Sequence, residues 1–164
     1  MTKKKTILGF TLLEVMIVVA IIGVMAGIAV PNFIGWLPDY RLRSATRDIV
    51  SCLQGMKMRA VAENSNTVII FNLTNNSYKS FVDDDAGGTA YSCDGSETTL
   101  KEATLLTGVD FLSSTFTSTT APYHYFGFNS RGLPSTRGGR IILKNSNSKI
   151  MEVIVNSVGN IRVQ

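Results

Sequence analysis

Glu14 is a single carboxylate inside an apolar run of 22 residues, 10–31. A helix of that length crosses roughly 30 Å of hydrocarbon, where a lone charge costs roughly 2.5–3.5 kcal/mol. The sequence therefore predicts a cationic partner for Glu14, and no residue of the run can supply one. Cleavage between Gly9 and Phe10 would remove the lysines of residues 3–5 and create an α-amine four residues before Glu14, a cation at neutral pH. We expect a processed chain in which Glu14 pairs with an amine, on a neighbouring copy.

The N-terminal residues follow an unusual order for an exported chain. A secretory signal places its small-residue cleavage site after the apolar core, whereas Gly9 precedes it here. A short basic leader, Gly9-Phe10 and then Glu14 resemble the class III signal of type IV prepilins and pseudopilins over residues 3–31. The resemblance implies that a prepilin peptidase cuts after Gly9 and methylates the Phe10 amine, and that Glu14 neutralises the amine of an adjacent subunit during assembly. The competing interpretation is a plain membrane anchor with a tolerated polar residue.

The charges around the apolar run predict its orientation. Three lysines precede it, so the leader stays cytoplasmic and everything after Pro31 is exported. Pro31 lacks an N–H and should kink or locally melt the helix, and the resemblance implies that this loosening accompanies assembly. We expect a single-pass protein of the bacterial inner membrane, with its C-terminal domain in the periplasm or the filament.

The remainder of the chain has the periodicity of one amphipathic helix followed by short strands. Leu42, Ala45, Ile49, Leu53, Met56 and Ala60 recur at helical spacing, and turn-forming residues end the helix near 64–66. Strands are predicted at 67–71, 78–82, 109–112, 123–128, 140–144, 150–155 and 161–163, with turns at 145–148 and 158–160. The fold class is α+β, a long N-terminal helix packed on an antiparallel β-sheet domain in a pilin-like lollipop. The predicted parts are a leader (1–9), a transmembrane and assembly helix (10–31), its amphipathic continuation (32–64) and an exported β-rich domain (65–164).

Three short segments of the β-rich domain indicate which pilin-like family the chain resembles. They are residues 128–132, 140–143 and 155–162. They are similar to the H-type minor pseudopilins of type II secretion and to the related minor pilins of type IV pili. The resemblance implies a structural subunit whose partners are other pilin or pseudopilin subunits, the prepilin peptidase and an inner-membrane assembly platform. The resemblance does not distinguish a subunit of type II secretion from a subunit of a type IV pilus.

Few residues elsewhere in the chain are candidates for a disulfide, a metal site or catalysis. Cys52 and Cys93 either form a disulfide in an oxidising compartment or stay buried free thiols. His124, among aromatic residues, is expected to pack in a strand. The aspartates and glycines of residues 83–88 lack the EF-hand spacing, so we expect a solvated turn, with no metal and no cofactor. No nucleophile has an identifiable base, which predicts that the protein is not an enzyme.

A DNA-binding minor pilin for DNA uptake is the alternative function. The chain has 16 Lys and Arg against 12 acids, but loss of the leader removes three of these cations, so overall charge no longer favours a nucleic-acid partner. The cations are nevertheless concentrated in residues 131–164, where four arginines could contact phosphates: Arg131, Arg137, Arg140 and Arg162. Asn160 stands where DNA-uptake relatives tend to have another arginine, and no aromatic stacking platform is interleaved. Ordinary solubilising charge is the competing interpretation.

Overall fold

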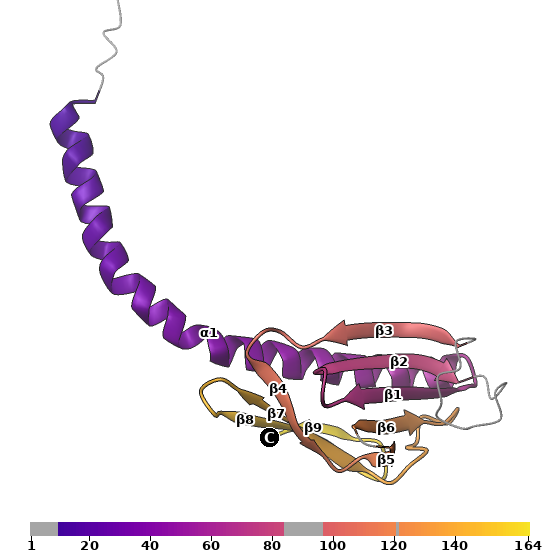
Figure 1. Cartoon of the computed structure of the whole chain (residues 1–164). Coiled ribbons are helices and arrows are strands. Elements are labelled where there is room, and N and C mark those ends of the chain that lie inside the picture. The colour runs from indigo at the N-terminus through magenta and orange to yellow at the C-terminus, as the bar shows by residue number, and fades with distance from the viewer. Residues whose placement is uncertain (1–9, 84–96, 121) are drawn as a thin grey trace, which may run out of the picture. The chain divides into compact units, whose positions relative to one another are not determined.

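The computed structural model describes residues 10–83, 97–120 and 122–164 (Figure 1). The chain divides into two compact units, one ending at Leu37 and the other beginning at Pro38. Helix α1 (Leu12–Ala62) starts in the first unit and ends in the second.

The first unit consists of the apolar part of α1. All residues from 10 to 36 are exposed, and among the described residues α1 is the one helix that is long and apolar enough to cross a membrane. Because this segment buries nothing against its own chain, its apolar side chains require lipid or other proteins around them.

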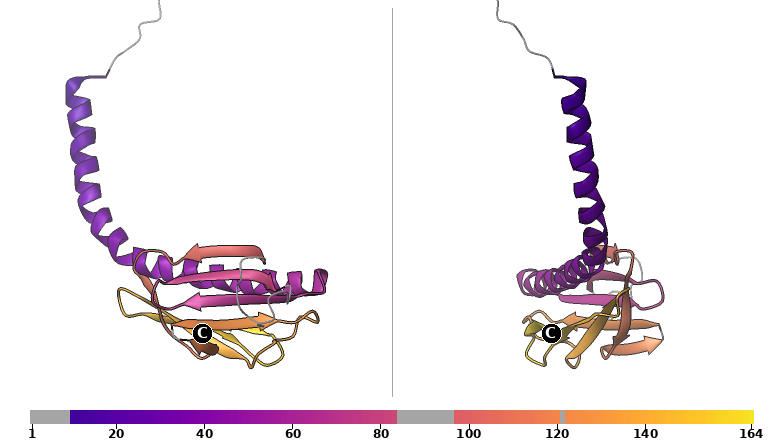
Figure 2. Two further views of the ribbon diagram at one scale, coloured as in Figure 1. Left: turned by 45° about the vertical axis from the view of Figure 1, so that its right-hand side comes forward. Right: turned by 90° about the vertical axis from the view of Figure 1, so that its left-hand side faces the viewer.

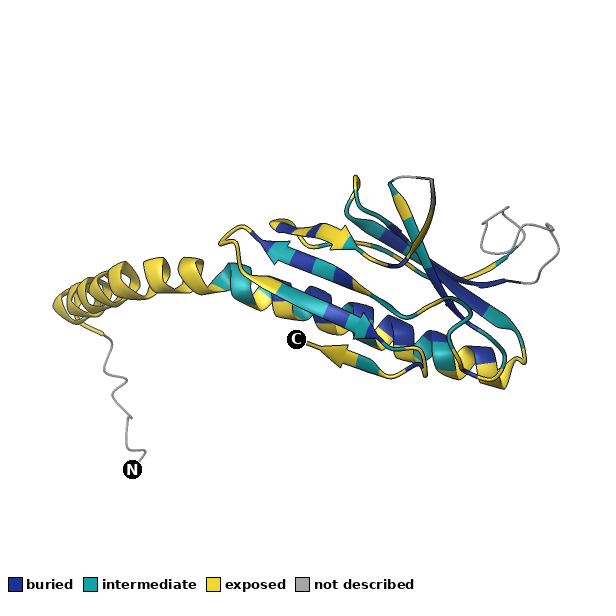
Figure 3. Ribbon diagram, turned by 90° about the horizontal axis from the view of Figure 1, so that it is seen from below, coloured by how far each residue is buried: buried dark blue, intermediate teal, exposed yellow. Residues whose placement is uncertain are grey.

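In the second unit, α1 is amphipathic as predicted. Figure 3 shows buried bands on α1 beside the strands of the domain. The residues with predicted helical spacing are all buried: Leu42, Ala45, Ile49, Leu53, Met56 and Ala60. The helix ends at Ala62, and Asn64 has a φ of +50°, a left-handed conformation typical of helix ends.

The strands form two antiparallel sheets, and the later half of α1 runs along the strands of the domain (Figure 2). The five-stranded sheet has the order β3-β2-β1-β6-β5, and its strands are β1 (Asn66–Asn72), β2 (Ser77–Asp83), β3 (Thr98–Thr104), β5 (Thr117–Thr120) and β6 (Tyr123–Phe128). The four-stranded sheet has the order β4-β7-β8-β9, and its strands are β4 (Val109–Ser114), β7 (Gly139–Asn145), β8 (Ile150–Val155) and β9 (Ile161–Val163).

The predicted fold class, a long helix packed on antiparallel β-structure, is confirmed. Each of the seven predicted strands is present, and those at 123–128, 150–155 and 161–163 have the predicted bounds. Two strands, β3 and β5, were not predicted, and the strands divide into two sheets.

An aromatic cluster joins the two sheets in the core. The Phe71 ring of β1 lies 5.6 Å from that of Phe111 in β4, and 5.8 Å from that of Phe116. Phe116 continues the cluster to Phe126 at 4.9 Å, and Phe126 contacts Phe128 at 5.0 Å. Such pairs contribute about 0.5–1.5 kcal/mol each beyond the burial of their surface. The cluster therefore holds β1 and β6 of one sheet against β4 of the other.

Three turns of the domain share one hydrogen-bonding pattern, and we call them the asparagine turns. They begin at Asn129, Asn145 and Asn156, and in each the Asn Oδ1 accepts from the backbone N–H groups two and four residues later. The fourth residue of each turn has a positive φ: +71° at Gly132, +63° at Ser148 and +77° at Gly159. Asn side chains commonly stabilise turns in this way. The turns predicted at 145–148 and 158–160 are thereby confirmed.

Candidate assembly site and charged side chains of the domain

Thr11 caps the start of α1, and Glu14 lies in the first turn. The Glu14 N–H donates to Thr11 Oγ1 at 3.2 Å and to the Thr11 carbonyl oxygen at 3.1 Å, as expected for an N-cap threonine. The positive end of the helix dipole favours an acid here by about 0.3–1 kcal/mol. That gain is smaller than the roughly 2.5–3.5 kcal/mol cost of a lone charge in a membrane helix. The helix end therefore cannot replace a counter-ion.

Glu14 has no counter-ion in the part of the chain that the structure describes. The ion pairs found there include Arg59–Glu63, Lys101–Asp48, Arg140–Glu152 and Lys149–Asp39. Phe10, the residue predicted to carry the new amine, is 84% exposed. Gly9 lies outside the described residues, so cleavage between Gly9 and Phe10 stays a prediction.

The rest of the apolar segment leaves its helix surface open. A Cβ atom built on Gly23 or Gly27 meets no heavy atom within 4 Å, apart from the helix's own neighbouring backbone. Small residues four apart allow two helices to approach closely in lipid. Pro31 lies inside α1, which is helical on both sides of it, and the predicted kink or melting there stays a prediction.

The cysteine and metal predictions fall partly outside the described residues. Cys52 is buried on α1, 3.4 Å from Ser80 Oγ, and burial raises the pKa of its thiol. Cys93 lies outside the described residues, so the disulfide stays a prediction. Of the aspartates proposed as a solvated turn, Asp83 is buried at the end of β2 and the others are not described. His124 packs in β6 as predicted, with Nδ1 3.3 Å from the Phe116 carbonyl oxygen.

The four arginines of the DNA-binding alternative have different surroundings. Arg140 and Arg162 both lie opposite Ile154 of β8, which places them on one face of the four-stranded sheet. Arg140 Nη1 lies 3.2 Å from Glu152 Oε2, so an acid already compensates its charge. Arg131 belongs to the asparagine turn at Asn129, and Arg137 lies in the loop before β7.

Two charged networks that the sequence did not predict fasten α1 to the sheets. Asp48 of α1 accepts hydrogen bonds from Tyr78 Oη of β2 and Lys101 Nζ of β3. Burial acts to raise the pKa of Asp48, but its hydrogen bonds with Lys101 and Tyr78 outweigh this and hold the pKa below its ordinary value. Burial and the neighbouring Asp48 raise the pKa of Tyr78. The phenol therefore stays a neutral donor.

The second network lies at the start of the domain. Asp39 Oδ1 accepts from Asn145 Nδ2 at 2.8 Å, and Asp39 Oδ2 accepts from Lys149 Nζ at 2.7 Å. The hydrogen bond from Lys149 is the largest influence on the Asp39 carboxyl and lowers its pKa. Asn145 also organises its own turn through its Oδ1, so one buried side chain fixes both the turn and the helix.

The chain has an exposed apolar helix with an acid in its first turn, and this helix continues as an amphipathic helix on antiparallel sheets. Together these features define the class of pilin-like subunits. The model of the family Type II transport protein GspH matches residues 45–159, and that of the Prokaryotic N-terminal methylation motif matches residues 4–30. The chain belongs to the GspH family.

Solved structures share the fold, and a curated relative matches part of the chain. The fold is similar to that of the minor pseudopilin EpsH of Vibrio cholerae, with a TM-score of 0.57 and 8% identity over 76% of this chain and 96% of that one. It is also similar to the type IV minor pilin FimU of Pseudomonas aeruginosa, with a TM-score of 0.56 and 13% identity over 77% and 90%. At these identities the likeness shows the fold alone. The type IV major fimbrial protein FimA of Dichelobacter nodosus is 50% identical over 56 residues, which span 34% of this chain and 32% of the relative.

Proposed function

We propose that the chain is a minor pilin or pseudopilin subunit of a type II secretion pseudopilus or a type IV pilus. A prepilin peptidase would cut it between Gly9 and Phe10 and methylate the Phe10 amine, and the inner-membrane assembly platform would add it to the filament. The match to the methylation motif over residues 4–30 supports the processing steps. The observation that carries the proposal is Glu14, an acid in the first turn of an exposed apolar helix with no counter-ion among the described residues of its own chain.

In this mechanism the Phe10 amine of one subunit approaches Glu14 of another. Each charge is costly in hydrocarbon when alone, so pairing recovers part of that cost on assembly. Only one axial offset between neighbouring helices brings the amine to the carboxylate, so the pair also sets their register. The exposed apolar surface of residues 10–36, with its open positions at Gly23 and Gly27, would then pack against other subunits.

Replacing Glu14 by glutamine tests the mechanism, because it removes the charge and keeps the shape. We expect Glu14→Gln to insert in the membrane and accumulate normally, and to be depleted about 100-fold from sheared filaments, the factor that corresponds to roughly 2.5–3.5 kcal/mol. Val15→Ala, a neighbouring change without charge, is the control and should be incorporated. Normal incorporation of Glu14→Gln would refute the pairing.

Mass spectrometry of the protein from the membrane fraction tests processing independently. The expected N-terminus is a methylated Phe10. A chain that still begins at Met1 would refute the cleavage step whatever the assembly result. No observation favours the DNA-uptake alternative, and Glu152 already compensates the charge of Arg140.

A further inference from the structure

Three segments meet at the end of the domain where α1 enters it, and we call this the helix-entry end: residues 39–43 of α1, the loop 105–108 and the turn 145–149. Arg41 Nη1 donates to the Thr107 carbonyl oxygen at 2.9 Å, and the Ser146 N–H donates to the Gly108 carbonyl oxygen at 3.1 Å. Asp39 binds the turn through Asn145 and Lys149. These contacts make the helix-entry end one continuous surface of the second unit.

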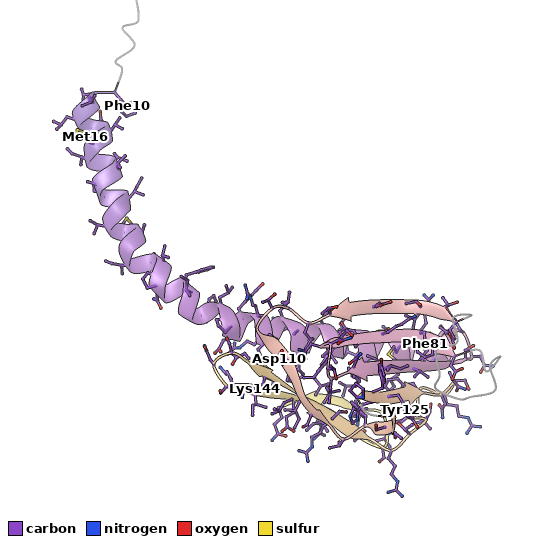
Figure 4. The ribbon with its side chains drawn as sticks, viewed as in Figure 1. Phe10, Met16, Phe81, Asp110, Tyr125 and Lys144 are labelled. Atoms are coloured by element: carbon purple, nitrogen blue, oxygen red, sulfur yellow. The ribbon has the colours of Figure 1, made fainter. Side chains whose placement is uncertain are left out.

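This surface is positively charged and partly apolar. Its cations, with Lys144 at the border of the turn, are Arg41, Arg43, Lys144 and Lys149. The acids are fewer. Asp39 is paired with Lys149, and Arg43 also lowers its pKa. Asp110 stands opposite Lys144 in the pairing of β4 with β7, and its Oδ1 accepts from Asn76 Nδ2 at 2.7 Å. Figure 4 labels Asp110 and Lys144 at this end of the domain, with Phe81 and Tyr125 further along it. Leu106 and Ile150, each 48% exposed, add apolar side chains.

Only a few residues of α1 separate the apolar segment from the arginines of this surface. Phe33, Ile34 and Trp36 are each more than 60% exposed, and tryptophan is enriched where membrane meets water. Arg41 and Arg43 follow Trp36 by five and seven residues, about 8–10 Å along a helix. The headgroup layer on each side of the hydrocarbon is about 5–8 Å thick. Both arginines are therefore within reach of lipid phosphates and inside one Debye length, about 8–10 Å.

We propose that the helix-entry end binds the headgroups of anionic phospholipids through Arg41, Arg43 and Lys144, while Leu106 and Ile150 insert between them. The subunit is then held at a fixed depth and orientation in the membrane before assembly. The proposal rests on membrane anchoring and on neither cleavage nor filament entry, so the two sets of experiments can fail separately.

The test uses the full chain in nanodiscs that hold one copy each, made of phosphatidylcholine with or without phosphatidylglycerol. Hydrogen exchange of residues 105–108 and 145–149 should slow when phosphatidylglycerol is present, and raised salt should reverse this because it screens exposed charges. One cation near an anionic surface changes occupancy about fivefold, so Arg41→Gln with Arg43→Gln should lower it about thirtyfold.

Two further variants show whether the effect is specific to the cations of the helix-entry end. Arg43→Gln alone leaves the hydrogen bond of Arg41 intact and should lower occupancy about fivefold. Arg131→Gln with Arg137→Gln makes the same change of net charge away from the helix-entry end and should keep the lipid effect. Equal exchange in both lipids, persistence of the effect without Arg41 and Arg43, or equal loss in the control would overturn the proposal. In a second set of discs that hold two chains, protection that single-chain discs lack and that does not depend on the lipid would assign this surface to a second copy and overturn the proposal as well.

Discussion

Replacing Ser148 by glycine should stabilise the domain, and replacing Gly159 by alanine should destabilise it. Both residues occupy the fourth position of an asparagine turn, with φ values of +63° and +77°. The domain thus contains a serine and a glycine with the same backbone conformation and the same pattern of hydrogen bonds, so their substitutions can be compared directly.

The magnitudes follow from the backbone and from the space around each Cβ. A non-glycine residue in the left-handed region costs about 1–2 kcal/mol, and glycine loses about 0.5–1 kcal/mol more backbone entropy on folding. Ser148→Gly should therefore raise the free energy of unfolding by about 0.5–1 kcal/mol. At Gly159 a Cβ would lie 3.2 Å from the Gly132 carbonyl oxygen and 3.3 Å from both Lys57 Nζ and Pro134 Cδ. This crowding adds to the backbone cost, so Gly159→Ala should lower the free energy of unfolding by about 2 kcal/mol.

Urea unfolding of the full chain in detergent micelles, followed by near-ultraviolet circular dichroism, measures both effects. One kcal/mol corresponds to a change in the urea midpoint of about 0.3–1 M. Gly108→Ala is a matched control, because Gly108 has a φ of +85° but a Cβ there would have only Ser146 Oγ nearby, at 3.9 Å. It should show the backbone cost without the crowding.

A lower free energy of unfolding for Ser148→Gly would show that the left-handed serine carries no strain. Equal costs for Gly108→Ala and Gly159→Ala would show that the close approach of the turns at Asn129 and Asn156 has no energetic effect.

Asp48 and Cys52 give two further predictions. Because the pKa of Asp48 is lowered in the folded chain, its contribution is present above the ordinary carboxyl pKa and lost as pH falls through the lowered value. Asp48→Asn should therefore cost about 1 kcal/mol at neutral pH, a small amount since Asp48 is 45% exposed. The difference from the unmodified chain in urea unfolding should begin to shrink near pH 4 and vanish only below the lowered pKa of Asp48. Burial and a raised pKa should protect the Cys52 thiol, so we expect alkylation followed by mass spectrometry to modify it only upon unfolding. Rapid labelling of folded Cys52 would contradict the burial.

Periodicity predicted the elements that have one buried face. The stripe from Leu42 to Ala60 recurs at helical spacing because one face of the helix packs on the core. The strands at 123–128 and 150–155 are runs rich in aromatic or β-branched residues. Strand β3, Thr98–Thr104, has no buried residue and lies at a sheet edge, and its sequence holds few apolar residues. Strand β5 is four residues of threonine and serine. Such strands depend on their neighbours more than on their own residues.

The charged networks could not be predicted, because they join residues distant in sequence. Asp48 and Lys101 meet only after β2 and β3 pair beside α1, and Asp39 meets Lys149 across 110 positions. Glu14, in contrast, could be identified from local sequence alone. Its surroundings in sequence are uniformly apolar, so a single charge stands out without knowledge of the fold.

The exposed state of residues 10–36 separates two kinds of harmful mutation. Substitutions there remove no contact within the domain, so a subunit that carries one should reach its usual abundance and resist proteases. It should nevertheless fail in assembly. Substitutions at Leu53 or Phe126 should act through protein quality control instead, by lowering the amount of folded subunit. A genetic screen that scores abundance and function separately would therefore draw the boundary between the two units without any structural measurement.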